Sequence, residues 1–227
     1  MNNTVILTDV SFEIDSDQLI KKLHIPNQEG HIEKFKELVN CARPVARPKA
    51  MYKICYIESR GDNTVTIDGI RLTSRILRVN LDEIHRVFPF VATCGRELAE
   101  WSKSFDDILE QFWADAIMKE AVHIAFDICK EHIETHLQTG QTSFMEPGSL
   151  EDWPTGEQKA LFKLLGNPLE AIGVELTDSC LMVPIKSLSG IRFPTEVNFE
   201  NCQLCPRENC SGRRAAYDPI LLKSKYK

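Results

Sequence analysis

Three cysteines are crowded into nine residues near the C-terminus of the chain. Cys202, Cys205 and Cys210 form the pattern C-x₂-C-x₄-C. A gap of two residues lets two thiolates converge on one ion while backbone amides point at the sulfurs. Thiolates suit both zinc and iron–sulfur clusters, so the spacing predicts a metal site of one of these two kinds. Free thiols and a disulfide are the alternative interpretations.

The residues around this cluster favour a ligand loop. Pro206 stiffens the chain directly after a cysteine, and Arg207, Arg213 and Arg214 favour thiolates over thiols. Three cysteines do not complete a four-ligand site. We predict Cys94 as the fourth ligand, because it stands in a turn at the end of an expected strand. Histidines and the remaining cysteines are further candidates.

Other reactive residue types give weaker signals. His132 and His136 are four residues apart, which is compatible with a metal, but the H-E-x-x-H order is absent and a solvated helix face is the better interpretation. Ser179 has no visible base partner, so a hydrolase has little support. The sequence therefore identifies no catalytic residue.

The composition is that of a globular protein. The chain has 227 residues, 43% hydrophobic and 26% charged, with a formal net charge of -6. This negative charge argues against nucleic-acid or anionic-membrane partners. No apolar run approaches the roughly 20 residues of a membrane span, and the first residues lack a secretory signal, so we expect a cytoplasmic protein. Because that compartment disfavours disulfides, the five cysteines outside the tail are by default small buried hydrophobes.

The elements that must position these residues fall into three expected segments. Residues 1–48 form an amphipathic helical segment, residues 49–197 an α+β core, and residues 198–227 a loop-like cysteine-rich tail. Helices mixed with short hairpin strands favour α+β over a regular βαβ alternation. The expected helices are those after the Asp15 cap and at 31–41, 81–87, 96–103, 106–137 (capped by Asp106) and 155–165, and the expected strands are 51–57, 64–67, 88–93, 174–176 and 181–185.

One stretch of the core carries a family resemblance. Residues 176–184 read L-T-D-S-C-L-M-V-P, residues 187–190 read S-L-S-G, and Pro147-Gly148 lie upstream. In order and spacing these resemble the L-T-x-S-x-x-M-x-P, S-V-S-G and P-G-Y motifs of the activation domain of cobalamin-dependent methionine synthase. The match covers residues 144–191. Free-standing versions of that domain with a cysteine-rich tail also look like this chain.

The resemblance implies a fold, a partner and a set of contacts. The fold is a twisted antiparallel sheet with flanking helices. The family domain docks on a corrinoid protein and presents S-adenosylmethionine, while an electron donor protein supplies the electron that restores oxidised cobalt. The ligand-contacting positions that the resemblance implies in this sequence are Pro147, Gly148, Ser187, Ser189, Gly190 and Arg192.

Two departures bear on the ligand. The family arginine and tyrosine that contact S-adenosylmethionine are replaced by Phe144 and Ser149. A phenylalanine cannot make the bidentate contact of an arginine with a carboxylate. Arg192 offers a positive charge from another direction.

These features lead to three hypotheses. The first is an accessory protein that reductively reactivates, or otherwise services, a corrinoid methyltransferase such as methionine synthase, through a cysteine-ligated iron–sulfur cluster that delivers one electron. The second is a non-catalytic interaction protein with a structural zinc site. The third is an S-adenosylmethionine binder with altered contacts.

Overall fold

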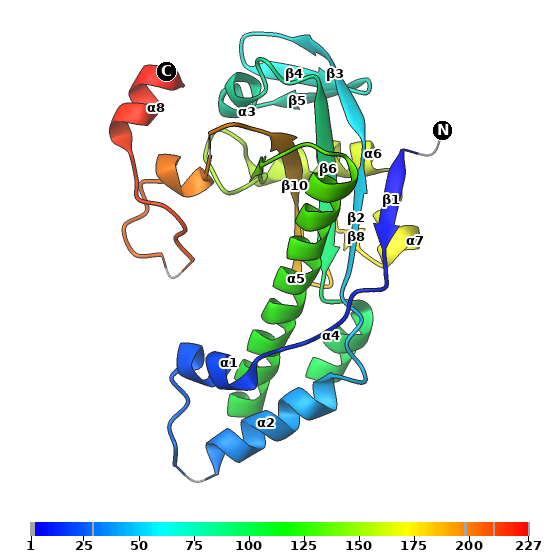
Figure 1. Cartoon of the computed structure of the whole chain (residues 1–227), viewed down its shortest axis with the longest axis vertical. Coiled ribbons are helices and arrows are strands. Elements are labelled where there is room, and N and C mark those ends of the chain that lie inside the picture. The colour runs from blue at the N-terminus through cyan, green and yellow to red at the C-terminus, as the bar shows by residue number, and fades with distance from the viewer. Residues whose placement is uncertain (1–2, 29, 198, 211, 227) are drawn as a thin grey trace.

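The computed structural model of the chain describes residues 3–28, 30–197, 199–210 and 212–226. One large antiparallel sheet carries helices on both faces, and a bundle of helices extends from one end of it (Figure 1). The predicted α+β class is confirmed. None of the helices in the described ranges is both long enough and apolar enough to cross a membrane.

The main sheet is built around β6, which is almost completely buried. Strands β2 and β3 follow one another along one side of β6, and β10 pairs with its other side. β1 lies outside β2, β4 and β5 lie outside β3, and β7 pairs with β10. A separate two-stranded hairpin is formed by β8 and β9. The strands are β1 (Thr4–Leu7), β2 (Lys49–Lys53), β3 (Cys55–Arg60), β4 (Thr64–Ile67), β5 (Ile70–Thr73), β6 (Arg86–Thr93), β7 (Thr142–Met145), β8 (Glu175–Leu176), β9 (Met182–Val183) and β10 (Ser187–Pro194).

The helices cover both faces of this sheet. α5 lies against β2, β6 and β10 on one face, whereas α3 and α6 pack on the other. The helices are α1 (Ser16–Leu23), α2 (His31–Ala42), α3 (Arg75–Asn80), α4 (Arg96–Ser102), α5 (Ile108–His136), α6 (Gln158–Leu165), α7 (Pro168–Ile172) and α8 (Pro219–Lys225), with 3₁₀ turns η1 (Thr155–Glu157) and η2 (Asn201–Leu204).

The long helix α5 joins the two ends of the molecule. Near its start, Trp113 packs edge-on against Phe35 of α2 in the core of the helical end. Near its finish, Cys129 and Ile133 pack against the sheet. Because α5 takes part in both cores, it fixes the helical end relative to the sheet, and Figure 1 shows it running along most of the molecule.

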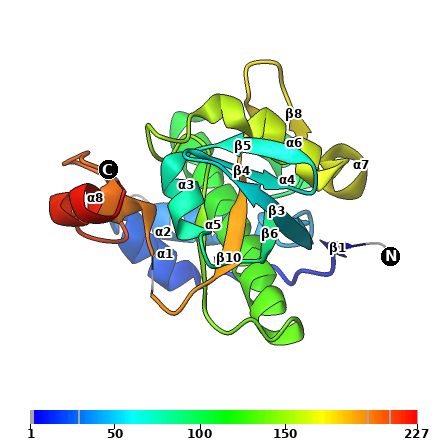
Figure 2. The ribbon, with the colours of Figure 1, turned by 90° about the horizontal axis from the view of Figure 1, so that it is seen from above.

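The tail lies on the opposite side of the molecule from the N-terminal strand β1 (Figures 1 and 2). It is anchored by Phe199, Leu204 and Tyr226, each 7% exposed or less, which join the core on the α6 face of the sheet. The tail is therefore packed on the sheet rather than free, and the loop-like prediction missed η2 and α8.

Three further predictions about the elements were wrong. The helix expected at 81–87 lies earlier, at α3, because Ser74 caps it and Asp152, distant in sequence, accepts the amides of Arg75 and Ile76. The long helix is capped by Asp107, whose carboxylate accepts two backbone amides of the first turn, and not by Asp106. The helical interpretation of residues 1–48 missed strand β1, whereas α1 with its Asp15 cap and α2 are confirmed.

Candidate functional site

The P-G loop, residues 146–153, joins β7 to the start of η1. Gly148 has a φ of 89°, and its amide donates to the carbonyl of Trp153 at 2.7 Å. A Cβ at Gly148 would lie 2.6 Å from the Thr155 hydroxyl. Both the positive φ and this close approach require glycine. Pro147 beside it is buried. The loop is therefore a closed turn held by its own backbone.

The S-L-S-G segment lies in β10, where successive side chains point to opposite faces. On the α6 face, the Ser189 hydroxyl donates to Gln158 Oε1 at 2.8 Å and is buried. The Ser187 hydroxyl lies 2.9 Å from Thr93 Oγ1 and 2.8 Å from the carbonyl of Pro184. Both serines thus have hydrogen-bond partners within the protein.

Gly190 and Arg192 belong to the other face of the same strand, towards α5. A Cβ on Gly190 would lie 2.4 Å from the carbonyl oxygen of Met145 in β7. Glycine is thus required here by the close approach of two strands. The ligand-contacting residues predicted from the resemblance are consequently divided between the P-G loop and two faces of the sheet, and the structure does not gather them around one cavity.

Arg192 is a buried cation, only 2% exposed. Its guanidinium lies 4.7 Å from the ring centroid of Phe126 and 5.2 Å from that of Phe144. Nη1 donates to the Thr142 hydroxyl at 3.0 Å, and that hydroxyl donates to Glu134 at 2.6 Å. Nε and Nη2 of Arg192 have no hydrogen-bond partner within the described residues. Burial lowers the pKa of Arg192.

Phe144 lies between two arginines. It is the direct cross-strand partner of Arg192, so the two side chains share a face of the sheet. Arg214 of the tail stacks on the same ring, 4.7 Å from its centroid. Arg214 also pairs with Glu200 at 2.9 Å and with Glu146 at 3.9 Å. The position of the family arginine is thus occupied by a ring that two guanidinium groups cover.

Glu146 connects the P-G loop to the tail. Its carboxylate accepts hydrogen bonds from the Ser149 hydroxyl at 2.7 Å and from the Asn201 amide at 3.5 Å. The side chain is 13% exposed. Burial raises the pKa of Glu146, an effect that Ser149 and Arg214 oppose. Ser149, at the position of the family tyrosine, is therefore used inside the protein.

In the cysteine loop, residues 202–214, the described residues 202–210 and 212–214 fold around the guanidinium of Arg213. This group donates to the carbonyls of Cys202 at 3.3 Å, Ala215 at 3.2 Å and Cys205 at 3.5 Å, and also to that of Arg207. The backbone amide of Arg214 donates to the sulfur of Cys202 at 3.4 Å. Cys202 and Cys205 are partly exposed and Cys210 is exposed.

The donor atoms do not form a finished metal site in this arrangement. Within the described ranges, no group of three or more His, Cys, Asp or Glu side chains is placed to hold an ion. Cys94 is fully buried in the core of the helical end, and burial raises its pKa to about 12. The structure does not bring it to the tail. Its environment is that of a packing thiol, so Cys94 does not fit a fourth ligand.

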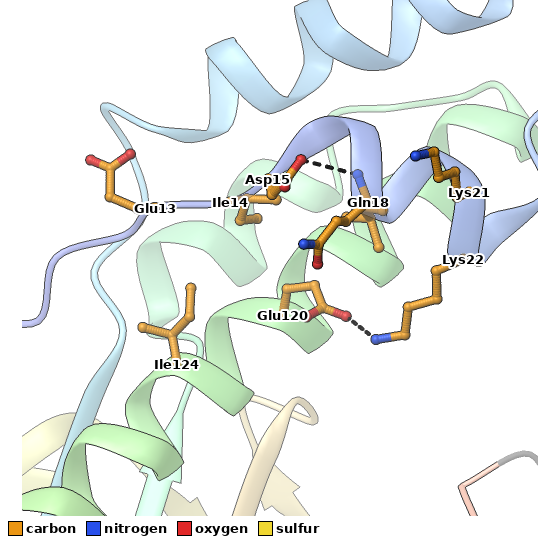
Figure 3. A pocket seen from close by; sticks show the side chains of 9 residues that line it. Glu13, Ile14, Asp15, Gln18, Lys21, Lys22, Glu120 and Ile124 are labelled. Carbon is orange, nitrogen blue, oxygen red and sulfur yellow. Dashed lines mark hydrogen bonds and ion pairs between the residues drawn. The ribbon is translucent and has the colours of Figure 1, made fainter.

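Two hollows are relevant to the site, one beside the P-G loop and the other at the helical end. A pocket of about 400 Å³ separates the P-G loop from the tail and is lined by Ser149, Asp152, Cys205 and Tyr226 among others. A groove of about 420 Å³ lies between α1 and α5 at the helical end, where Lys22 pairs with Glu120 at 2.6 Å (Figure 3). Of these two, only the first is lined by residues of both the P-G loop and the cysteine loop.

The paired histidines of α5 differ from the solvated pair that the sequence suggested. His136 is exposed, but His132 is half-buried and its Nδ1 lies 3.0 Å from the Tyr52 hydroxyl. The two imidazole rings stack with centroids 3.9 Å apart. Burial, and then the neighbouring His136, lower the pKa of His132. These contacts describe a packed aromatic cluster.

The sequence gives little signal for the role of Arg214 and none for that of Glu146. Its pattern indicates Arg214 only as a charge near thiols, and Glu146 lies within the F-M-E-P-G-S stretch without a motif position of its own. The signal that could have found Arg214 and Glu146 is the pair of replacements at Phe144 and Ser149. Side chains that replace ligand-contacting residues need other partners, and here these are Arg214 and Glu146.

The sequence matches no family model, and no curated protein sequence matches it significantly. The fold is similar to solved structures. A crystal structure described as the MetH reactivation domain bound to AdoHcy has a TM-score of 0.62 and 15% sequence identity, covering 87% of this chain and 81% of its own. The chain therefore has an activation-domain-like fold, as its motifs predicted. At this identity the likeness establishes the fold.

Proposed function

We propose that this chain is an accessory protein that reductively reactivates, or otherwise services, a corrinoid methyltransferase. The observation that carries the proposal is the likeness to the MetH reactivation domain over 87% of the chain. The motif residues fit this role, because they hold a binding platform together rather than form a catalytic group. The expected partner is a corrinoid-binding protein, with a separate electron donor where the chain has no redox centre of its own.

S-adenosylmethionine is the small molecule that the likeness suggests, since the similar structure holds AdoHcy. We place it in the pocket between the P-G loop and the tail. Its contacts would differ from those of the family, because Phe144 is covered by two guanidinium groups and Ser149 is bonded to Glu146. Calorimetry with S-adenosylmethionine tests this part, and no measurable heat at millimolar ligand would remove it.

We keep Cys202, Cys205 and Cys210 as proposed ligands of an iron–sulfur cluster, with zinc as the alternative. Their support is the shared loop, the partly exposed sulfurs and the amide that already points at Cys202. A cluster bound there would supply one electron at low potential. The three sulfurs do not point at one position in the described arrangement, so binding of a cluster would require the cysteine loop to change its conformation.

Anaerobic reconstitution with iron and sulfide tests the metal. We expect a brown protein with a broad visible band, matching iron and sulfide content, and a changed cobalt spectrum when a corrinoid protein and reductant are added. Cys205→Ser should abolish the band. Cys41→Ser, which alters an exposed thiol on α2, should leave it intact. A colourless protein that holds zinc favours the structural alternative. Failure to interact with any corrinoid protein would contradict the accessory role.

A further inference from the structure

Arg214 lies at the junction of the cysteine loop and the P-G loop. Its backbone amide donates to the Cys202 sulfur. Its side chain stacks on Phe144 near the end of β7, and it pairs with Glu200 of the tail at 2.9 Å and with Glu146 at the start of the P-G loop at 3.9 Å. Arg214 therefore contacts the proposed metal ligand Cys202 through its backbone, and it contacts Phe144 and Glu146 through its side chain.

The other contacts of the cysteine loop do not provide such a link. Arg213 donates only to carbonyls of the tail itself, so it organises the loop internally. Arg207 is exposed, and within the described ranges its side chain has no hydrogen bond or ion pair to the P-G loop. Among the described hydrogen bonds, the Cys202 sulfur is linked towards that loop only by the Arg214 amide, whereas the neighbouring Asn201 side chain donates to Glu146 directly and without the sulfur.

We propose that Arg214 is a positioning residue that couples Cys202 to the P-G loop. A change at the Cys202 sulfur moves the Arg214 amide, and the side chain of the same residue passes the change to Phe144 and Glu146. The coupling is reciprocal, since a ligand that moves the P-G loop alters the surroundings of Cys202 by the same free energy. This inference depends on the proposed function only for the identity of the metal at Cys202 and of the molecule that binds at the P-G loop.

The carboxylate of Glu146 makes the P-G loop sensitive to the loss of Arg214. It holds Ser149 and the tail residue Asn201 together with Arg214. Loss of Arg214 removes the positive charge from a largely buried carboxylate. The amides of Gly148, Ser149 and Trp153, all hydrogen-bonded within the loop, then open more often.

Amide hydrogen exchange of the metal-free protein, read by mass spectrometry, tests the coupling. Arg214→Ala should speed exchange over residues 146–153 by about tenfold, the combined effect expected for a partly exposed ion pair and a cation–π contact. Arg207→Ala, an arginine of the same loop, should leave it unchanged. Arg214→Lys should fall between, because lysine keeps the charge but not the planar stack.

A second pair of variants separates coupling from simple loss of the tail. Cys202→Ala removes the sulfur acceptor and should speed exchange of residues 146–153 by about threefold. Cys210→Ala should not. In the Arg214→Ala background, Cys202→Ala should add nothing. Exchange of α8 must stay constant, which shows that the tail is still docked. Equal effects of Cys202→Ala and Cys210→Ala, or a Cys202→Ala effect that persists without Arg214, overturn the proposal. Neither result depends on metal, S-adenosylmethionine or a corrinoid partner.

Discussion

Replacing Gly190 by alanine tests whether the S-L-S-G segment is a packing feature. The added Cβ would lie 2.4 Å from the carbonyl oxygen of Met145 and 3.1 Å from the Phe90 ring. The first obstacle is backbone of the paired strand β7, so β10 and β7 must move apart. Overpacking of this kind costs about 3 kcal/mol at the upper end of its usual range.

Part of this cost is offset in the unfolded chain, which loses about 0.7 kcal/mol of conformational freedom when glycine becomes alanine. The net destabilisation is about 2 kcal/mol, or a fall in Tm of roughly 4–8 °C for a chain of this length. Gly156→Ala is the matched control, because nothing lies within 4 Å of its added Cβ. It should be neutral or raise Tm by about 1–3 °C.

Thermal unfolding followed by circular dichroism measures both variants. Equal Tm values for Gly190→Ala and Gly156→Ala would refute the reasoning and return Gly190 to the ligand contacts. If Gly190→Ala is destabilised as expected, the glycine of the motif is accounted for by the distance between two strands, without any ligand.

Three other substitutions follow from the same contacts. Phe144→Arg places a second guanidinium directly opposite the buried Arg192 and should lower Tm by roughly 6–12 °C, whereas the exchange Phe144→Arg with Arg192→Phe should restore most of it. Asp107→Ala removes the cap of α5 and should lower Tm by about 2–4 °C, while Asp106→Ala should leave it unchanged. Glu146→Gln tests the buried carboxyl group. Burial raises the pKa of Glu146 in the folded state. The contribution of its protonated form to the stability of the wild type is therefore complete below the pKa that Glu146 has in the unfolded chain, and it is lost as the pH rises through the pKa that Glu146 has in the folded protein. The Tm of the wild type should therefore fall relative to Glu146→Gln between pH 4 and pH 8, and a constant difference would contradict the burial argument.

Local patterns predicted the elements whose stability is local. The helical period of α5 and the Asp15 cap of α1 need only neighbouring residues, and both elements are found. β7 was missed because all four of its residues are buried, so it shows no alternation, and its partner β10 follows more than forty residues later. The start of α3 was misplaced for a related reason, since the carboxylate of Asp152 that holds it is remote in sequence.

The candidate site was predictable in part. The motif placed the P-G loop and β10 in one fold, which the structure bears out. The alternation of side chains along a strand already implies that Ser189 and Arg192 point to opposite faces of β10, as the structure has them. The stacking of Arg214 on Phe144 was beyond reach, because it joins residues 70 positions apart through a tail that has no periodic signal.

The motif residues of the fold and the residues expected to contact a ligand have different explanations in this chain. Gly148 is explained by its positive φ and the nearby Thr155 hydroxyl, and Gly190 by the close approach of the Met145 carbonyl, in each case without a ligand. Two of the positions at which the sequence departs from the family pattern are engaged within the protein, Phe144 by Arg214 and Ser149 by Glu146. The tail thus contacts Phe144 through Arg214, whereas Ser149 is held within the P-G loop by Glu146. Arg214 covers the Phe144 ring, whereas the pocket beside Ser149 is lined by other tail residues, among them Cys205 and Tyr226, so a molecule bound in that pocket would contact the tail without touching Arg214.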